Sequence, residues 1–292
     1  MSEPDLTLGF IGIGLMGKPM TLRLLQHGFR VNVWNRSPEK LQPVVAAGAT
    51  ATASIAELVR ASDVVMICLA DTQAVEWALH HGIIGNGAPN KLVIDLSSID
   101  PNLTREFAAT LRASCGMGWV DAPVSGGVGG AEQGSLAIMA GGHAEHIDIA
   151  RHVLKPLYKQ LTHMGTVGSG QITKICNQMI VSCNMLVIAE MIALAKQAGV
   201  DAEKIPAALA GGFADSKPLQ IAGPEMALET FEPVKWRVKT LLKDLQMATK
   251  LASQLGNALP MSGLATQLLQ LHGSNGYLEQ DPATLIKLYR KD

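Results

Sequence analysis

The chain has 292 residues, of which 48% are hydrophobic and 17% are charged. This composition is typical of a folded chain with a large core and not of a disordered one, and the length favours two domains. The net charge of −1 at pH 7 gives no basic surface for nucleic acid or for an anionic membrane. Any anion that the protein binds must therefore be held by local geometry.

The first half of the chain alternates short apolar runs with helical patterns. The expected strands are Leu8–Ile13, Arg30–Trp34, Val64–Leu69 and Leu92–Leu96, with the edge of another at Trp119–Ala122. The expected helices between them are Met16–His27, Leu41–Ala47, Val75–His80 and Leu103–Ser114. Strands that alternate with helices predict an α/β fold of the Rossmann type, with a doubly wound parallel sheet.

After Val167 the pattern becomes helical. A long helix is expected at Gln171–Gln197, about 40 Å at 1.5 Å per residue. Further helices are expected at Ala202–Ala210, Lys235–Gln254, Pro260–His272 and Thr284–Tyr289. We therefore predict a dinucleotide-binding domain over residues 1–166. An all-α domain for substrate binding and oligomerisation should follow over residues 167–292, with the long helix at the junction.

The sequence predicts neither a membrane span nor a metal site. The most apolar stretch, Met179–Ala195, is interrupted by Asn184 and Glu190, which favours a buried helix. Residues Met1–Thr7 lack a basic region and a cleavage signature, and the four cysteines form no C-x-x-C pair. A cytoplasmic protein with free thiols is therefore expected. The eight histidines form no plausible metal cluster with acidic residues or cysteines.

A glycine-rich motif follows the first expected strand and opens the first expected helix. Gly12 would permit the tight turn, Gly14 would let a pyrophosphate approach the backbone, and Gly17 would let helix and strand pack closely. Leu15 and Met16 complete the loop, at a helix N-terminus whose free N–H groups suit a phosphate. Three ordinary turn glycines are the alternative.

The second expected strand ends in Trp34, Asn35, Arg36 and Ser37. A fold that prefers NAD usually has an acidic residue here to accept a hydrogen bond from the ribose 2′-hydroxyl. This chain offers donors instead, and the guanidinium of Arg36 suits the 2′-phosphate of NADP. A solvated surface arginine is the alternative interpretation.

The chain resembles the β-hydroxyacid dehydrogenase family through four motifs in the right order. These are Gly9–Met20, Asp121–Gly127 extended by Ala131 and Gly134, Gly168–Gln178, and Lys243–Leu245. The resemblance implies an oxidoreductase that moves a hydride between NADP(H) and a small β-hydroxyacid or its semialdehyde. Gly211–Ser216 and Asp95–Ser98 look similar to the tartronate semialdehyde reductases of the family. Trp34–Ser37 is similar to its NADPH-using glyoxylate/succinic semialdehyde reductases.

The resemblance also implies roles for single residues. Lys174 would be the general acid or base, and Asn177, one turn further on, would orient it. The substrate would be bound by Ser125, Gly126, Gly127, Gln178 and Lys243. From the residues alone, the turn at Ser125 could equally be an ordinary β-turn, Lys174 could reach to water, and Lys243 could pair with Asp244 at the surface.

Two loops at strand ends should line the cofactor. Ser98 follows the fourth expected strand, and Leu69 ends the third and opens the loop after it. Lys243 is expected close to the nicotinamide as well. Relatives usually have a proline where this chain has Ala70, which leaves that loop less rigid here.

Several alternatives remain open at this point. The chain could be an NAD-dependent 3-hydroxyisobutyrate dehydrogenase, a glyoxylate/succinic semialdehyde reductase, or a silent NADP-binding scaffold. Tartronate semialdehyde reduction to glycerate, with NADP(H) preferred and NAD(H) tolerated, is the interpretation we favour. A small carboxylate substrate and a homodimer or homotetramer are expected, with no nucleic acid partner.

Overall fold

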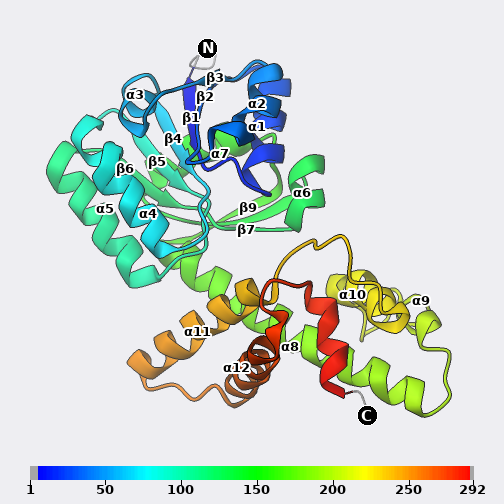
Figure 1. The fold of residues 1–292 in the computed structure, drawn as a ribbon. Helices are drawn as coiled ribbons and strands as arrows, with labels where there is room; N and C mark the ends of the chain where they lie inside the picture. Colours follow the sequence, from blue (N-terminus) through cyan, green and yellow to red (C-terminus); the bar gives the residue numbers. More distant parts are fainter. Residues whose placement is uncertain (1–5, 290–292) are drawn as a thin grey trace. The chain divides into compact units, whose positions relative to one another are not determined.

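The computed structural model describes residues 6–289 and contains two compact units, divided between Lys174 and Ile175 (Figure 1). The division falls within one long helix, α8 (Ser169–Gln197). The domain boundary expected at residues 166/167 stays a prediction.

The first unit is built on a nine-stranded sheet. Its strands are β1 (Thr7–Ile11), β2 (Arg30–Trp34), β3 (Thr50–Ala51), β4 (Val64–Ile67), β5 (Leu92–Asp95), β6 (Gly118–Asp121), β7 (Val124–Ser125), β8 (Leu136–Gly141) and β9 (Tyr158–Gly165). The order β3-β2-β1-β4-β5-β6 is parallel throughout and continues through β8, which is antiparallel to β6 and β7 and parallel to β9. The predicted parallel Rossmann-type sheet is confirmed, whereas β3, β7, β8 and β9 were not predicted.

Helices cover both faces of this sheet (Figure 1). They are α1 (Gly17–Gln26), α2 (Gln42–Ala46), α3 (Ile55–Arg60), α4 (Thr72–Ala78), α5 (Pro101–Cys115), α6 (Gly127–Gln133) and α7 (Ala144–Leu154). Shorter 3₁₀ or π turns lie at Pro38–Leu41, Leu79–Ile83 and Ile84–Asn86. The short helices α3, α6 and α7 were not predicted.

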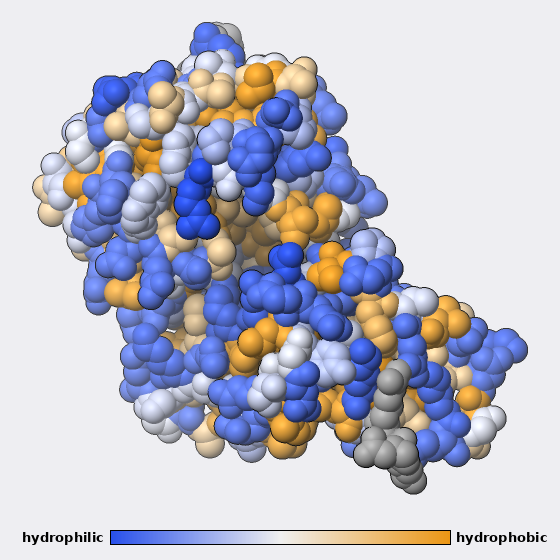
Figure 2. Space-filling model, viewed as in Figure 1, coloured by the Kyte–Doolittle hydropathy of each residue, from blue (hydrophilic) through white to orange (hydrophobic). Residues whose placement is uncertain are grey.

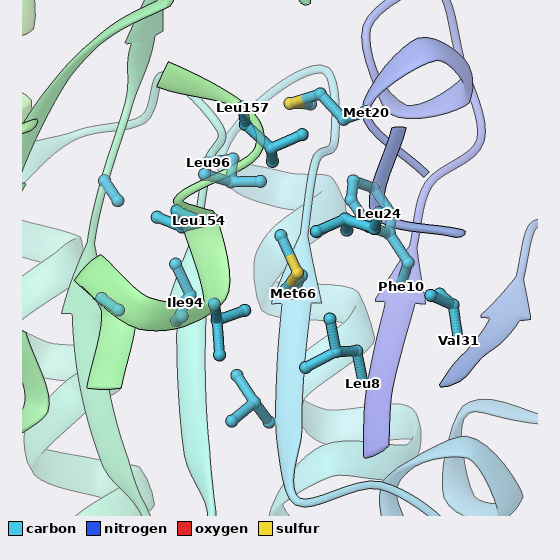
Figure 3. Close-up of a cluster of buried hydrophobic side chains, with 14 of the residues drawn as sticks. Leu8, Phe10, Met20, Leu24, Val31, Met66, Ile94, Leu96, Leu154 and Leu157 are labelled. Atoms are coloured by element: carbon cyan, nitrogen blue, oxygen red, sulfur yellow. The ribbon is translucent and has the colours of Figure 1, made fainter. Parts of the chain in front are cut away.

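The central strands are apolar on both sides because each face packs against helices. In β4, Met66 belongs to one buried cluster while Val65 and Ile67 belong to the other. Figure 3 shows the first cluster, where Phe10 of β1 and Met66 face Leu24 of α1. Burial of both faces of the sheet is typical of parallel sheets. The packing holds the carboxyl ends of these strands in place, and the candidate site lies at those ends.

All the regular elements in the described residues of the second unit are helical. The unit comprises most of α8, α9 (Ile205–Leu209), α10 (Lys217–Leu228), α11 (Val238–Leu255) and α12 (Pro260–His272), with 3₁₀ or π turns at Ala202–Lys204, Gly273–Tyr277 and Pro282–Tyr289. A separate buried cluster joins these elements, and the predicted all-α C-terminal part is confirmed. The expected helix at Thr284–Tyr289 is a 3₁₀ stretch, and α10 was not predicted.

Helix α8 is long and apolar enough to cross a membrane by length and composition alone. Half of its most apolar window is buried within the structure, and the core helix of a soluble protein passes the same test. Asn184 and Glu190 interrupt the apolar run of α8. The core helix of a protein in water tolerates such polar residues more readily than a lipid-facing helix does.

Candidate active site

The glycine-rich loop between β1 and α1 has the geometry of a phosphate cradle. Gly12 has φ +103°, and a side chain there would collide with the carbonyl oxygen of Cys68. A side chain at Gly17 would collide with the carbonyl oxygen of Gly12, so both positions need glycine. Gly14 has no heavy atom within 4 Å of where its Cβ would lie, which leaves room for a pyrophosphate against the backbone. Leu15 is exposed beside this space, and Met16 is half-buried at the start of α1.

The end of β2 is tied to the glycine-rich loop. The N–H of Gly12 donates to the carbonyl of Trp34 over 3.1 Å, and the N–H of Ile13 donates to Oδ1 of Asn35 over 2.9 Å. The amide of Asn35 also donates to the carbonyl of Ser37 over 2.9 Å. Asn35 thus fixes the glycine-rich loop to the end of β2, whether or not it also contacts a cofactor.

Arg36 lies exposed at this strand end. Within residues 6–289 it forms no ion pair and no hydrogen bond. Because the Asn35 amide is already engaged on both sides, the guanidinium of Arg36 is the group with the most free donors in this turn. Ser37 is half-buried next to it.

The ends of β4 and β5 lie on the same edge of the sheet as Gly12, because β1, β4 and β5 are parallel neighbours. The N–H of Leu69 donates to the hydroxyl of Ser97 over 2.9 Å, and the N–H of Ser97 donates to Asp95 over 2.9 Å. Leu69, and Ser98 next to Ser97, are half-buried. Ligands of open α/β sheets bind outside the carboxyl ends of the strands, which is where these residues lie.

Ser125 ends β7, and the turn after it opens α6. Gly126 and Gly127 have φ of +138° and +64°, conformations that favour glycine. Ser125 and Gly126 are half-buried and Gly127 is exposed. Nothing lies within 4 Å of where a Cβ at Gly127 would be, so a ligand can approach the backbone there, and N–H groups of a glycine-rich turn can donate hydrogen bonds to a carboxylate.

Asp121 and Gln171 form a buried network that the sequence analysis did not assign to the site. Asp121 accepts hydrogen bonds from the N–H groups of Gly168 (2.7 Å) and Gln171 (2.9 Å) at the start of α8. Burial raises the pKa of the Asp121 carboxyl to about 6, although these backbone donors act to lower it. The Gln171 side chain donates to the carbonyl of Ser97 (2.9 Å) and accepts from the N–H of Ile99 (3.1 Å). Asp121 lies in the family motif Asp121–Gly127 and Gln171 in the motif Gly168–Gln178, and this membership was the sequence signal that could have identified them.

This network fixes the first turn of α8 against the ends of β5 and β6. Lys174, half-buried, lies three residues after Gln171 and so on a neighbouring position of the same helix. It is only five residues from the helix start at Ser169, about 7.5 Å along the axis. The first unit therefore holds Lys174 near the same sheet edge as Ser98. Asn177 is half-buried one turn further along α8.

In the second unit, Gln178 and Lys243 meet at Asp244. The amide of Gln178 donates to Oδ2 of Asp244 over 2.6 Å, and Nζ of Lys243 lies 3.4 Å from Oδ1. Asp244 is 1% exposed and Gln178 is 6% exposed. Asp244 is thus the residue that joins α11 to α8 and orients Lys243. The Lys-Asp-Leu motif contained it, but the sequence assigned it no role beyond a possible surface pair.

The residues of the first unit can hold a dinucleotide and move a proton. The glycine cradle fits a diphosphate, Arg36 fits an additional phosphate, and Lys174 supplies an amine near the strand ends. Across residues 6–289, no three histidines, cysteines or carboxylates are grouped as a metal ion would need.

Comparison with known families divides the chain in two. Residues 7–165 match the NAD-binding domain of 6-phosphogluconate dehydrogenase, and residues 168–289 match the NAD-binding region of NADP-dependent 3-hydroxyisobutyrate dehydrogenase. Both families bind pyridine nucleotides, as the cradle geometry suggests.

Individual relatives match over nearly the full chain. The chain is 34% identical to 2-hydroxy-3-oxopropionate reductase of Escherichia coli K12, over 96% of each protein. It is 32% identical to NAD-dependent L-serine dehydrogenase of Pseudomonas aeruginosa, over 97% of each. The solved structure of Mycobacterium tuberculosis 3-hydroxyisobutyrate dehydrogenase with L-serine superposes with a TM-score of 0.88 and 28% identity, covering 98% of this chain and 99% of that one. The chain therefore belongs to the β-hydroxyacid dehydrogenase family of pyridine-nucleotide-dependent oxidoreductases.

Proposed function

We propose that this chain is an NADP(H)-dependent reductase that converts tartronate semialdehyde to glycerate. The observation that carries the cofactor preference is the turn after β2, where Arg36 is exposed with its donors free and no acidic side chain occupies Asn35, Arg36 or Ser37. A 2′-phosphate would gain charge-assisted hydrogen bonds there, whereas the 2′-hydroxyl of NAD would find no carboxylate.

A nicotinamide bound here would supply the hydride for the carbonyl carbon of the substrate. Lys174 gives a proton to the carbonyl oxygen, so that the aldehyde becomes an alcohol; in the reverse direction a neutral Lys174 takes the hydroxyl proton. Asn177, one helical turn away, orients the lysine amine or the substrate hydroxyl. The buried bonds of Asp121 and Gln171 keep the lysine's helix in place during the reaction.

The substrate carboxylate is bound by the turn of Ser125, Gly126 and Gly127, where the Ser125 hydroxyl and accessible backbone N–H groups can donate hydrogen bonds to it. The family resemblance also assigns Gln178 and Lys243 to substrate binding, and Lys243 to the nicotinamide. The relative with 34% identity, 2-hydroxy-3-oxopropionate reductase, supports tartronate semialdehyde as the substrate. An NAD-dependent 3-hydroxyisobutyrate dehydrogenase is the second candidate, since relatives at 32% identity carry that name or act with NAD.

A panel of steady-state rates tests the proposal. Tartronate semialdehyde, glyoxylate, succinic semialdehyde and methylmalonate semialdehyde are each reduced with NADPH and with NADH. We expect the highest kcat/KM for tartronate semialdehyde with NADPH. A preference for NADH, or for methylmalonate semialdehyde, would replace the proposal with the second candidate. Tight NADPH binding without turnover on any of them would indicate a silent scaffold.

We also propose a cytoplasmic homodimer or homotetramer. Ile180, Val187 and Leu194 are exposed on α8 at intervals of seven residues and thus form one apolar stripe. Figure 2 shows hydrophobic residues interspersed with hydrophilic ones on the viewed face of the helical unit. Light scattering on the purified protein measures the mass, and a monomer at micromolar concentration would contradict this part of the proposal.

A further inference from the structure

A cavity of about 430 Å³ lies between α5 and the start of α7, within the first unit. Helix α5 contributes Arg105, Ala108, Ala109 and Arg112, and the segment entering β6 contributes residues 116–119. None of the residues assigned above to the cofactor or the substrate lines it. Its volume falls in the range of small-molecule sites, so it is large enough for a metabolite.

The rim of this cavity is cationic. Arg105 and Arg112 lie seven residues apart on α5, two turns along one face. Within the described residues neither pairs with a carboxylate. Arg105 is oriented by bonds to Asn102 (2.9 Å) and to the carbonyl of Val167 (3.3 Å), and Glu145 is the one acidic residue of the lining.

Arg112 is oriented by His143. Its Nη1 lies 3.3 Å from Nε2 of His143, and because arginine can only donate, that ring nitrogen is the acceptor in this contact. His143 is also the N-cap of α7, with no side-chain cap on the helix. The uncapped first turn of α7 adds partial positive charge to the same wall of the cavity.

One of the lining residues, Trp119, has a buried donor without an acceptor. Trp119 is 3% exposed, and its indole N–H has no hydrogen-bond partner among residues 6–289. Nδ1 of His146 is buried and unpartnered as well, and the imidazole packs where a side chain at Gly118 would otherwise lie. Buried polar groups are rarely left unpaired, so a ligand that reached either atom from the cavity would gain a hydrogen bond there.

We propose that this cavity binds a small organic anion with two acidic groups. The backbone positions of Arg105 and Arg112 are about 10 Å apart, which allows each guanidinium to engage one acidic group. The short aliphatic body of the ligand would lie on Ala108, Ala109 and Met117, close to the indole of Trp119. Two carboxylates, or a carboxylate and a phosphate, satisfy this chemistry equally.

The test follows the indole N–H resonances of the four tryptophans by ¹⁵N NMR, with NADPH present at saturation. Trp119→Phe assigns the Trp119 resonance. The probes are glutarate, which has two carboxylates, and 2-phosphoglycolate, which has a carboxylate and a phosphate; butyrate, with one carboxylate, is the control. We expect the Trp119 resonance to shift saturably with one of the two dianions, with a dissociation constant of about 1 mM or tighter. Which dianion binds more tightly identifies the second acidic group.

Charge variants locate the binding. Arg105→Gln and Arg112→Gln should each weaken binding of the anion by about tenfold. Arg60→Gln is the matched control because Arg60 is an exposed arginine on α3 that does not line the cavity. A Trp119 resonance that neither dianion moves would overturn the proposal. So would an equal affinity for butyrate, or an equal loss of affinity in Arg60→Gln.

Discussion

Gln171→Met tests how the fold holds the site. Methionine has nearly the same volume as glutamine, so the packing is retained while both side-chain hydrogen bonds are lost. The N–H of Ile99 and the carbonyl of Ser97 would remain buried without partners, since these residues are 0% and 2% exposed. Each unpaired buried group costs about 1–3 kcal/mol, so the free energy of unfolding should fall by about 2–6 kcal/mol for the two groups.

Activity should fall with stability in this variant. Gln171 ties the helix of Lys174 to the end of β5, and a displacement of the reacting groups by about 1 Å can cost up to about 100-fold in rate. We expect kcat to drop about tenfold or more, while the KM for the cofactor changes less. Asp121 still caps the start of α8, so the helix itself should persist.

Urea unfolding followed by tryptophan fluorescence measures the loss of stability. Trp34, Trp77 and Trp119 lie in the first unit and only Trp236 in the second, so the signal reports chiefly the unit that contains Gln171. Gln160→Met is the matched control, because Gln160 is exposed and, among residues 6–289, its side chain bonds only to Thr162. The free energy of unfolding of this variant should stay within about 0.5 kcal/mol of the parent. A change equally small in Gln171→Met, with an unchanged urea slope, would refute the reasoning.

Three further results are expected. Arg36→Ala should raise the KM for NADPH by about tenfold and leave that for NADH nearly unchanged, and the difference should shrink at high salt because the contact is exposed; an equal loss with both cofactors would contradict this role. Ser125→Ala should weaken the binding of semialdehydes that carry a carboxylate by about 1.5–3 kcal/mol, as measured by KM, and an equal penalty on an aldehyde without a carboxylate would indicate a merely structural turn. Burial lowers the pKa of His272 from 6.5 to about 4, and its Nε2–H donates to the hydroxyl of Thr284. The neutral ring therefore stabilises the fold above pH 6.5, and this contribution to the free energy of unfolding is lost as the pH falls from 6.5 towards 4. Thermal melts over that pH window should therefore show a larger fall for the parent than for His272→Gln, and parallel curves would disprove the linkage.

Elements with a clear periodicity could be predicted from the sequence. The strand Arg30–Trp34 and the helix Pro260–His272 have the bounds that were expected. In the strand, buried Val31 and Val33 alternate with more exposed residues, and in the helix Pro260 marks the first turn. Local patterns were sufficient in these places because tertiary contacts agree with them.

Other elements carried no such signal. In β9, Leu161 is the only buried side chain of eight residues, so the strand does not alternate. Helix α10 contains Gly223 and Pro224, which normally interrupt helices, and its formation depends on packing of the buried cluster around it. These elements are determined by long-range contacts that a local pattern does not contain.

The same reason explains which site residues were missed. The glycine cradle is local, so its spacing predicted it. Asp121 and Gln171 are 50 positions apart and meet only once β6 and α8 are in place. Asp244 meets Gln178 across 66 positions. Residues that hold the catalytic groups in position are thus harder to find from sequence than those that make up the motifs.

The central claim is that Lys174 gives a proton to the substrate during hydride transfer. Single-turnover reduction of tartronate semialdehyde by Lys174→Met, with NADPH already bound, tests it most directly. Binding of NADPH is checked separately by the change in tryptophan fluorescence. Trp34 should contribute to this change, because its carbonyl bonds to Gly12 of the glycine-rich loop. Lys196→Met, at an exposed lysine of the same helix, is the control. We predict a rate that is lower by about 10²–10⁴-fold with nearly unchanged NADPH affinity, whereas a near-parental rate in Lys174→Met would contradict the account.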